Sequence, residues 1–286
     1  MSEENKRSIR ISVRNLVEFV LRSGDIDNRR SGNAQKDAML AGGRIHRKIQ
    51  KRMGSGYRAE VPLKHEVTDD EQEIVLSVEG RADGIFTENG ITVIDEIKGM
   101  YTDVARLEAP IEVHLAQAMC YGYFYCCDKD LDGIRLQLTY CNLETEEIRR
   151  FQTDRSKEEL EQWFSGVVHE YFKGARYLYH HELTRDASIR NLEFPYPYRE
   201  GQRDLVVSVY RTISRKKRLF IQAPTGIGKT LSTVFPAVRA IGEGKGDKLF
   251  YLTAKTVTRT VAEEALRILR GKGLIFTSVT ITAKEK

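Results

Sequence analysis

Asp83, Glu96 and Lys98 are the side chains of this 286-residue chain whose types and spacing best fit metal-assisted chemistry. Two carboxylates that face each other across neighbouring strands destabilise a sheet unless a cation offsets their charge. Mg²⁺ would offset it, because this ion prefers oxygen ligands at about 2.0–2.1 Å. A second interpretation stays open, in which the acids form a surface pair that Arg81 and Lys98 neutralise.

A hairpin is predicted to bring the three side chains together. Asn89-Gly90 separates two strand-like segments and favours a two-residue type I′ turn. In that register Asp83 lies opposite Glu96, with Cβ atoms about 4.5–5.5 Å apart. Lys98 points to the same face, since side chains alternate along a strand. The sequence therefore predicts two acids and an amine gathered at one point of a sheet.

The run ITVIDEIKG (91–99) also has the form of a P-loop ATPase strand that ends in a magnesium-binding acid. However, DEIKG precedes the glycine loop by about 130 residues, whereas such an acid ordinarily follows its loop. Glu96 also has a predicted partner in Asp83, which an ATPase strand of this kind does not need, and Lys98 stands two residues on, on the same face. We therefore expect an active site separate from ATP binding.

Asp83 followed by Glu96-x-Lys98 on the next strand resembles the core of the PD-(D/E)-x-K nucleases. Ala82 stands where the motif name has proline. His46, in GGRIHRKIQ, matches the metal-ligating histidine on a preceding helix in the RecB-type branch. The resemblance implies that His46, Asp83 and Glu96 hold Mg²⁺ or Mn²⁺ during phosphodiester hydrolysis. It also implies that Lys98 orients or deprotonates the attacking water.

Gln117 and Tyr121, in QAMCY, match the Q-x-x-x-Y motif of the same branch, and the resemblance covers about residues 10–185. Their four-residue spacing places both on one face of a helix. The resemblance implies that they position the DNA strand. Taken alone, a helical Gln and Tyr pair more often reflects packing than DNA contact.

The run APTGIGKT (223–230) lies between an apolar segment and an amphipathic one. Such glycine loops let backbone N–H groups cradle phosphates. The variant resembles motif I of superfamily-two helicases, with Ala223 where the general motif has glycine. The expected ATP-binding residues here are Thr225, Gly226, Gly228, Lys229 and Thr230.

Two flanking segments resemble further motifs of the XPD/DinG-like helicases. YREGQ resembles their adenine-sensing motif, carried by Arg199 and Gln202. LFYLTAKT resembles motif Ia, in which Thr253, Lys255 and Thr256 lie near single-stranded DNA. In this family TITAKEK (280–286) leads into the cysteines of an iron–sulfur cluster. We therefore expect such a cluster only in a downstream part of a longer protein.

The composition indicates a globular protein, with 41% hydrophobic and 30% charged residues. No apolar run approaches the roughly 20 residues that span a bilayer, so we expect no membrane partner. The four cysteines lack C-x-x-C spacing, which favours core positions and a cytoplasmic location. Residues 1–58 carry 14 Lys and Arg against 6 Asp and Glu, a surplus suited to phosphate contacts.

The pattern of segments predicts two α/β units. Residues 1–190 are expected to form a restriction-endonuclease-like mixed sheet flanked by helices. Residues 191–286 are expected to form the N-terminal part of a P-loop (RecA-like) helicase lobe, incomplete and with motifs I and Ia only. The strands predicted from apolar runs are 57–63, 73–87, 91–98, 134–143, 146–153, 218–222 and 248–256.

These features predict a metal-dependent DNA nuclease, with exonuclease action expected, coupled to an ATP-dependent DNA helicase in DNA repair or processing. The alternative is a catalytically silent, nuclease-like module that binds DNA for an ATP-driven helicase. The presence of His46, Asp83, Glu96 and Lys98 together favours the enzyme. Strand polarity and the choice between ends and internal sites stay open.

Overall fold

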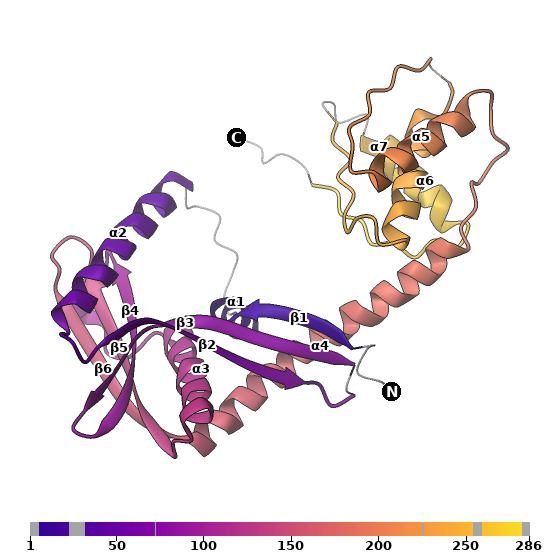
Figure 1. The fold of residues 1–286 in the computed structure, drawn as a ribbon. Coiled ribbons are helices and arrows are strands. Elements are labelled where there is room, and N and C mark those ends of the chain that lie inside the picture. The colour runs from indigo at the N-terminus through magenta and orange to yellow at the C-terminus, as the bar shows by residue number, and fades with distance from the viewer. Residues whose placement is uncertain (1–5, 23–31, 72, 225, 254–258, 282–286) are drawn as a thin grey trace. The chain divides into compact units, whose positions relative to one another are not determined.

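The computed structural model describes residues 6–22, 32–71, 73–224, 226–253 and 259–281 (Figure 1). The chain divides into two compact units, Met1–Arg176 and Tyr177–Lys286. This division falls inside a long helix, α4 (Lys157–Arg190), and precedes the predicted boundary at 190/191. The assignment of a function to each unit stays a prediction.

The N-terminal unit is built on one mixed sheet, as the sequence predicts, and this sheet has six strands, one more than predicted. Two pairs of strands are parallel, β1 with β3 and β4 with β5, and the other pairs are antiparallel. The strands are β1 (Arg7–Ser12), β2 (Arg58–Thr68), β3 (Ile74–Glu88), β4 (Ile91–Met100), β5 (Gly133–Asn142) and β6 (Ile148–Ser156).

Helices flank this sheet (Figure 1). The Ser12 hydroxyl accepts a hydrogen bond from the Asn15 backbone N–H at 3.1 Å and so caps the first helix. The helices of this unit are α1 (Val13–Val20), α2 (Gly32–Arg52), the short 3₁₀ helix η2 (Val104–Arg106), α3 (Glu112–Lys129) and most of α4.

Helices α2 and α3 lie on opposite faces of β4. Ile45 and Ile49 of α2 pack against buried Ile97 of β4. Gln117 of α3 contacts Lys98, the next residue of the same strand. Because neighbouring side chains of a strand point to opposite faces, the two helices approach β4 from opposite sides.

Strand β3 has a gap along the edge that it shares with β1 and β4. β1 pairs as far as Ser12–Glu79, and β4 pairs only from Gly84–Asp95 onward. On the other edge of β3, strand β2 pairs with residues 80–82 and with Gly84. Residues 80–83 therefore have no strand partner on the shared edge, and β3 and β4 separate there like the arms of a fork.

This fork corrects one prediction. The Asn89-Gly90 turn and its register are confirmed from Glu88–Ile91 to Gly84–Asp95. Asp83 and Glu96 are not a ladder pair, because the ladder ends one step earlier. Beyond Asp95, β4 keeps only its pairing with β5 on its other edge, so the two acids lie across an opening rather than across paired backbones.

The described C-terminal residues form helices α5 (Gln202–Ser214), α6 (Lys229–Gly242) and α7 (Arg259–Arg270). They share an apolar core that includes Val206, Val238 and Leu269. The predicted strands at 218–222 and 248–256 are wrong for their described residues, which form no strand. A strand requires a paired neighbour, and these segments instead leave side chains such as Phe220 exposed.

Two expectations from composition can be compared with the structure. Cys120, Cys126 and Cys141 are buried, Cys127 is half-buried, and all four are free thiols. Among the residues that the structure describes, no helix combines the length and apolar character needed to cross a bilayer.

Candidate functional site

Asp83 lies at the point of the fork, and its side chain replaces a missing ladder bond. The Ile97 backbone N–H donates to Asp83 Oδ2 at 2.7 Å. In a continuing ladder, this N–H would have bonded to a carbonyl of β3. The hydrogen bond fixes the carboxylate of one arm against the backbone of the other.

Helix α2 holds Asp83 through two residues one turn apart. His46 Nδ1 lies 3.3 Å from Asp83 Oδ1, and Gln50 Nε2 donates to the Asp83 backbone oxygen at 3.0 Å. Burial acts to lower the pKa of His46, but the hydrogen bond and charge of Asp83 outweigh it and raise that pKa. The structure thus brings the predicted His46 and Asp83 together.

Gln50 also donates to Glu60 Oε1 at 3.2 Å. Glu60 lies on β2 between the pairs that flank Asp83, and its φ of 55° is rare for a residue with a side chain. Strained backbone of this kind clusters at functional sites. The unusual backbone of Glu60 therefore lies opposite Asp83, at the candidate site.

Glu96 is buried behind the fork, with a side chain only 5% exposed. Burial raises its pKa to about 7; the charge of Lys98 acts to lower it, and that of Asp83 to raise it further. Its Oε2 atom is buried and has no hydrogen-bond partner among the residues that the structure describes. A carboxylate oxygen left in this state is unfavourable unless a cation or proton joins it.

Lys98 joins Glu96 to helix α3. Its Nζ atom lies 2.7 Å from Glu96 Oε1 and donates to Gln117 Oε1 at 2.8 Å. An ammonium group has three N–H donors, so one donor remains for a further ligand. Gln117 is 4% exposed and therefore reaches Lys98 from inside the protein.

Tyr121 lies one turn further along α3 and is 6% exposed. Its hydroxyl hydrogen-bonds to the backbone of Arg81, in the unpaired part of β3. Burial, with the charges of Glu96 and Asp83, raises its pKa. Gln117 and Tyr121 thus reach the predicted cluster, but their recorded contacts are with protein groups, and their role in DNA binding stays a prediction.

Asp95 supports the site from the opposite face of β4. It is fully buried and accepts hydrogen bonds from Tyr57 Oη (3.0 Å), Gln137 Nε2 (3.1 Å) and Thr139 Oγ1 (2.6 Å). Burial raises its pKa even though these bonds act to lower it. These hydrogen bonds connect Asp95 of β4 with β5 and with Tyr57, which precedes β2.

His114 is a residue near the candidate site that the sequence analysis did not name. It lies one turn before Gln117 on α3, and its Nδ1 lies 3.2 Å from the Tyr140 hydroxyl. Tyr140 is the ladder partner of Lys98. The spacing of His114, Gln117 and Tyr121 along one helical face was the available signal.

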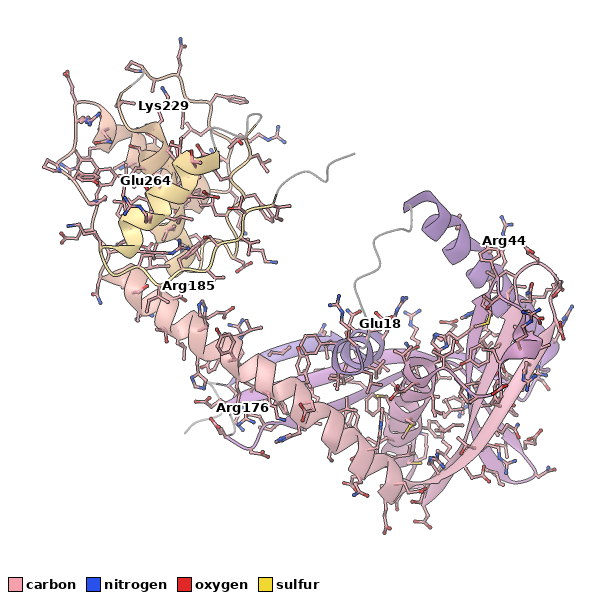
Figure 2. The ribbon with its side chains drawn as sticks, turned by 180° about the vertical axis from the view of Figure 1, so that it is seen from behind. Glu18, Arg44, Arg176, Arg185, Lys229 and Glu264 are labelled. Carbon is pink, nitrogen blue, oxygen red and sulfur yellow. The ribbon has the colours of Figure 1, made fainter. Side chains whose placement is uncertain are left out.

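Helix α2 also carries exposed basic side chains, and Figure 2 shows Arg44 on this helix. Lys48 and Arg52 form ion pairs with Glu146 in the turn between β5 and β6. Arg44 and Arg47 are exposed on the helix that bears His46. Positive charge thus lies on the helix that bears His46, and its contact with DNA phosphates stays a prediction.

The glycine loop of the C-terminal unit precedes α6, with Lys229 at the start of that helix (Figure 2). Gly226 and Gly228 have φ values of 88° and 75°, in the region that favours glycine. Lys229 Nζ donates to the Ala223 and Pro224 carbonyls, at 2.9 Å each. Thr230 follows in the first turn, and Thr225 lies outside the described residues.

Arg199 and Gln202 contact this loop. The Arg199 guanidinium donates to the Gly226 carbonyl, and Gln202 Nε2 donates to the Ile227 carbonyl at 2.8 Å. Of the predicted DNA-binding residues in this unit, Thr253 is exposed. Lys255 and Thr256 lie outside the described residues.

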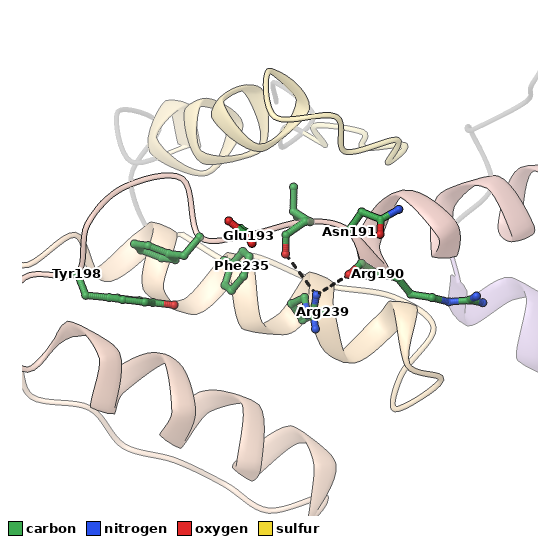
Figure 3. Close-up of a pocket in the computed structure, with 8 residues that line it drawn as sticks. Arg190, Asn191, Glu193, Tyr198, Phe235 and Arg239 are labelled. Atoms are coloured by element: carbon green, nitrogen blue, oxygen red, sulfur yellow. Dashed lines mark hydrogen bonds between the residues drawn. The ribbon is translucent and has the colours of Figure 1, made fainter.

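A hollow of about 690 Å³ lies elsewhere in the C-terminal unit (Figure 3). Phe235, Tyr198 and Arg239 help to line it. Arg239 donates to the carbonyls of Arg190 (3.2 Å) and Leu192 (3.3 Å), so it caps the C-terminal end of α4. None of the predicted site residues lines this hollow.

Comparisons with known proteins add limited information. No protein-family model matches this sequence. A probable ATP-dependent helicase of Methanocaldococcus jannaschii is 45% identical over 47 residues, which is 16% of this chain and 7% of that protein. The crystal structure of SSO0001 aligns at 18% identity and a TM-score of 0.37, over 59% of this chain and 77% of that one. An alkaline exonuclease from Laribacter hongkongensis aligns at 12% identity and a TM-score of 0.36, over 60% and 92%. At such low scores, function is best argued from the side chains.

Proposed function

We propose that the N-terminal unit is a metal-dependent deoxyribonuclease with exonuclease action, linked to an ATP-dependent DNA helicase segment in DNA repair or processing. The observation that carries the nuclease proposal is the unpartnered, buried Oε2 atom of Glu96. It lies where the charges of Lys98, Asp83 and His46 all act on the carboxylate. A buried acid of this kind is costly for the fold and useful for binding a cation.

The side chains present fit a hard divalent cation. Two carboxylates and one imidazole are ligand types that Mg²⁺ and Mn²⁺ accept. Asp83, Glu96 and His46 would hold the ion. When bound, such an ion polarises the phosphate and lowers the pKa of a bound water.

Lys98 is the second functional group of the proposed reaction. Glu96 and Gln117 each occupy one N–H of the Lys98 ammonium group. These two contacts fix the direction of the third N–H. That N–H orients the attacking water or donates to a phosphate oxygen that gains charge. Asp83 stays fixed by the Ile97 N–H while this happens.

The alternative is a silent DNA-binding module. In the structure Lys98 pairs with Glu96, and His46 pairs with Asp83. A structural cluster that neutralises itself would have the same contacts. Such a module would bind DNA and leave it intact.

Cleavage of end-labelled linear DNA, with Mg²⁺ or Mn²⁺ and without ATP, separates the two functions. We expect wild-type protein to release labelled nucleotides, and Glu96→Ala and Lys98→Ala to lose at least about a hundredfold in rate, as for removal of one transition-state donor. Intact DNA with the wild type, at protein concentrations that bind it, would establish the silent module.

Glu66→Gln is the matched control for Glu96. Glu66 is an exposed acid on β2 that pairs with Lys64 at the surface, so its loss should leave the rate unchanged. Equal cleavage by wild type, Glu96→Ala and Lys98→Ala would identify a contaminating nuclease.

ATP binding by the C-terminal unit is the second part of the proposal. Lys229 lies at the N-terminal end of α6, where the helix dipole favours phosphate. Its ammonium donates to the Ala223 and Pro224 carbonyls. A bound β- or γ-phosphate would replace these neutral acceptors with a stronger, charged one.

A further inference from the structure

His114 belongs to the same cluster as Lys98, although no predicted motif includes it. Lys98 and Tyr140 are partners in the ladder between β4 and β5, so their side chains point to the same face. Tyr140 bonds to His114, and Lys98 bonds to Gln117, one helical turn from His114. The imidazole therefore lies on the same face of the sheet as Lys98, close enough for the lysine charge to act on it.

The hydrogen bonds of Tyr140 determine which nitrogen of His114 carries a proton. Tyr140 is fully buried, and its hydroxyl oxygen accepts the Ile111 backbone N–H at 2.9 Å. Among the described residues, the one acceptor recorded for its hydroxyl proton is His114 Nδ1, at 3.2 Å. Buried hydroxyl protons are normally donated, so Nδ1 accepts and Nε2 carries the hydrogen.

The surroundings also keep His114 neutral. Burial lowers its pKa to about 4, and the positive charges of Lys98 and Arg14 act in the same direction. At neutral pH the ring is therefore an uncharged donor through Nε2. It is only half-buried, so the ring is not fully enclosed by protein.

We propose that His114 binds substrate directly, by donating its Nε2–H to a phosphate oxygen of the DNA strand held at Lys98. The inference rests on the proposed nuclease function. A neutral donor beside a lysine suits a phosphate that is next to the scissile one, because it adds a directional contact without a second buried charge. The Ile111 N–H holds the Tyr140 hydroxyl, and this hydroxyl contacts Nδ1, so the two groups together fix the orientation of the imidazole.

Two substitutions test the donor. His114→Leu removes the N–H and retains an apolar side chain of similar bulk, whereas His114→Gln restores an N–H near the position of Nε2. Binding of a fluorescein-labelled single-stranded oligonucleotide is measured by anisotropy in EDTA, where no cleavage occurs. Steady-state cleavage is measured separately with Mn²⁺.

We expect His114→Leu to weaken DNA binding by about tenfold or more, the value of one hydrogen bond to a charged group. Its KM should rise by a similar factor with little change in kcat, because the contact persists from ground state to transition state. His114→Gln should recover most of the affinity. His169→Leu, which alters an exposed histidine of α4 in the same unit, should bind and cleave as wild type does.

Each outcome decides the proposal. Wild-type affinity in His114→Leu overturns it, and so do equal losses in the Leu and Gln variants, since a structural role would not distinguish them. A wild type that binds but does not cleave removes the nuclease function, while the anisotropy series still decides whether His114 is a phosphate donor. A wild type with no affinity for DNA overturns both.

Discussion

Glu96 shows how a functional side chain can oppose stability at the scale of one residue. Its carboxylate is buried, and within the described part of the chain Oε2 has no hydrogen-bond partner. Lys98 compensates one oxygen only. Ionised Glu96 therefore costs free energy in the metal-free protein, which a proton or a cation would recover.

The metal-free protein should become more stable, relative to Glu96→Gln, as the pH falls from about 7. Burial raises the Glu96 pKa from 4.5 to about 7, so between these values the folded state binds the proton that the unfolded state has lost. The stabilisation is complete below about pH 4.5 and is lost as the pH rises through the folded pKa. The linked change is on the order of 3 kcal/mol.

Urea unfolding of both proteins in EDTA, at several pH values, measures this difference. The Gln variant has no titrating group at position 96, so the effects of other ionisable groups largely cancel in the comparison. Parallel stability curves for the two proteins would show that Glu96 titrates normally. Added Mn²⁺ should reverse the order above pH 7, because it stabilises only a protein that retains the acid.

At the scale of elements, the fork between β3 and β4 depends on two glycines of β3. A Cβ atom on Gly84 would lie 1.8 Å from Tyr57 Oη, and one on Gly80 would lie 2.6 Å from Tyr121 Oη. Tyr57 donates to Asp95 and stacks on Phe86 with ring centroids 5.7 Å apart. Gly80 and Gly84 flank Asp83 in the sequence. Because they lack a Cβ atom, Tyr121 and Tyr57 can pack directly against β3 at these two positions.

Gly84→Ala should destabilise the N-terminal unit by about 2–4 kcal/mol. The methyl group would displace Tyr57, overpack the site and deprive buried Asp95 of one of its donors. Chemical unfolding measures the change. Gly166→Ala is the control, because this helical glycine has nothing within 4 Å, and alanine there should stabilise α4 by up to about 1 kcal/mol.

A double variant identifies the cause. If Tyr57 is what the new methyl group meets, Gly84→Ala added to Tyr57→Ala should cost much less than it does alone. Additive costs would mean that the backbone at Gly84, rather than contact with Tyr57, sets the penalty.

Short-range patterns in the sequence predict most elements of the N-terminal unit. Asn89-Gly90 fixed the register of the β3–β4 hairpin, because turn chemistry is local. The fork was not predictable from local patterns, because it depends on the pairing of β4 with β5, and these strands are far apart in the sequence. Strand β1 (Arg7–Ser12) was missed for a related reason: a short, half-exposed edge strand has a weak apolar pattern and depends on β3.

The same distinction applies to the site. His46 and Lys98 were found through motif spacing. His114 was missed, since its position depends on the register of Tyr140 with Lys98. In the C-terminal unit, apolar segments 218–222 and 248–252 have strand-like composition but no strand partner among the described residues. Composition predicts a preference for strand, and only pairing turns that preference into structure.

At the scale of the whole molecule, each unit has its own apolar core and its own proposed ligand. The C-terminal core brings Ile189 and Leu192, from the end of α4 and just beyond it, against α6 and α7. The N-terminal core lies around the sheet and includes Leu76 and Leu138. Separate cores of this kind favour unfolding in two steps.

Differential scanning calorimetry of the full chain should therefore show two transitions with different ligand responses. A ligand that binds only the folded state at a hundred times its Kd stabilises that state by about 2.7 kcal/mol. This raises the melting temperature of the N-terminal unit, Met1–Arg176, by about 5–10 °C, and that of the smaller C-terminal unit by more. Mn²⁺ should raise one transition, and ADP added with Mg²⁺ should raise the other beyond the shift that Mg²⁺ alone produces. Glu96→Ala should abolish only the first response, and Lys229→Ala only the second.

An ADP response that survives Lys229→Ala would place the nucleotide away from the glycine loop. A single transition raised by both ligands would show instead that α4 couples the units into one cooperative structure.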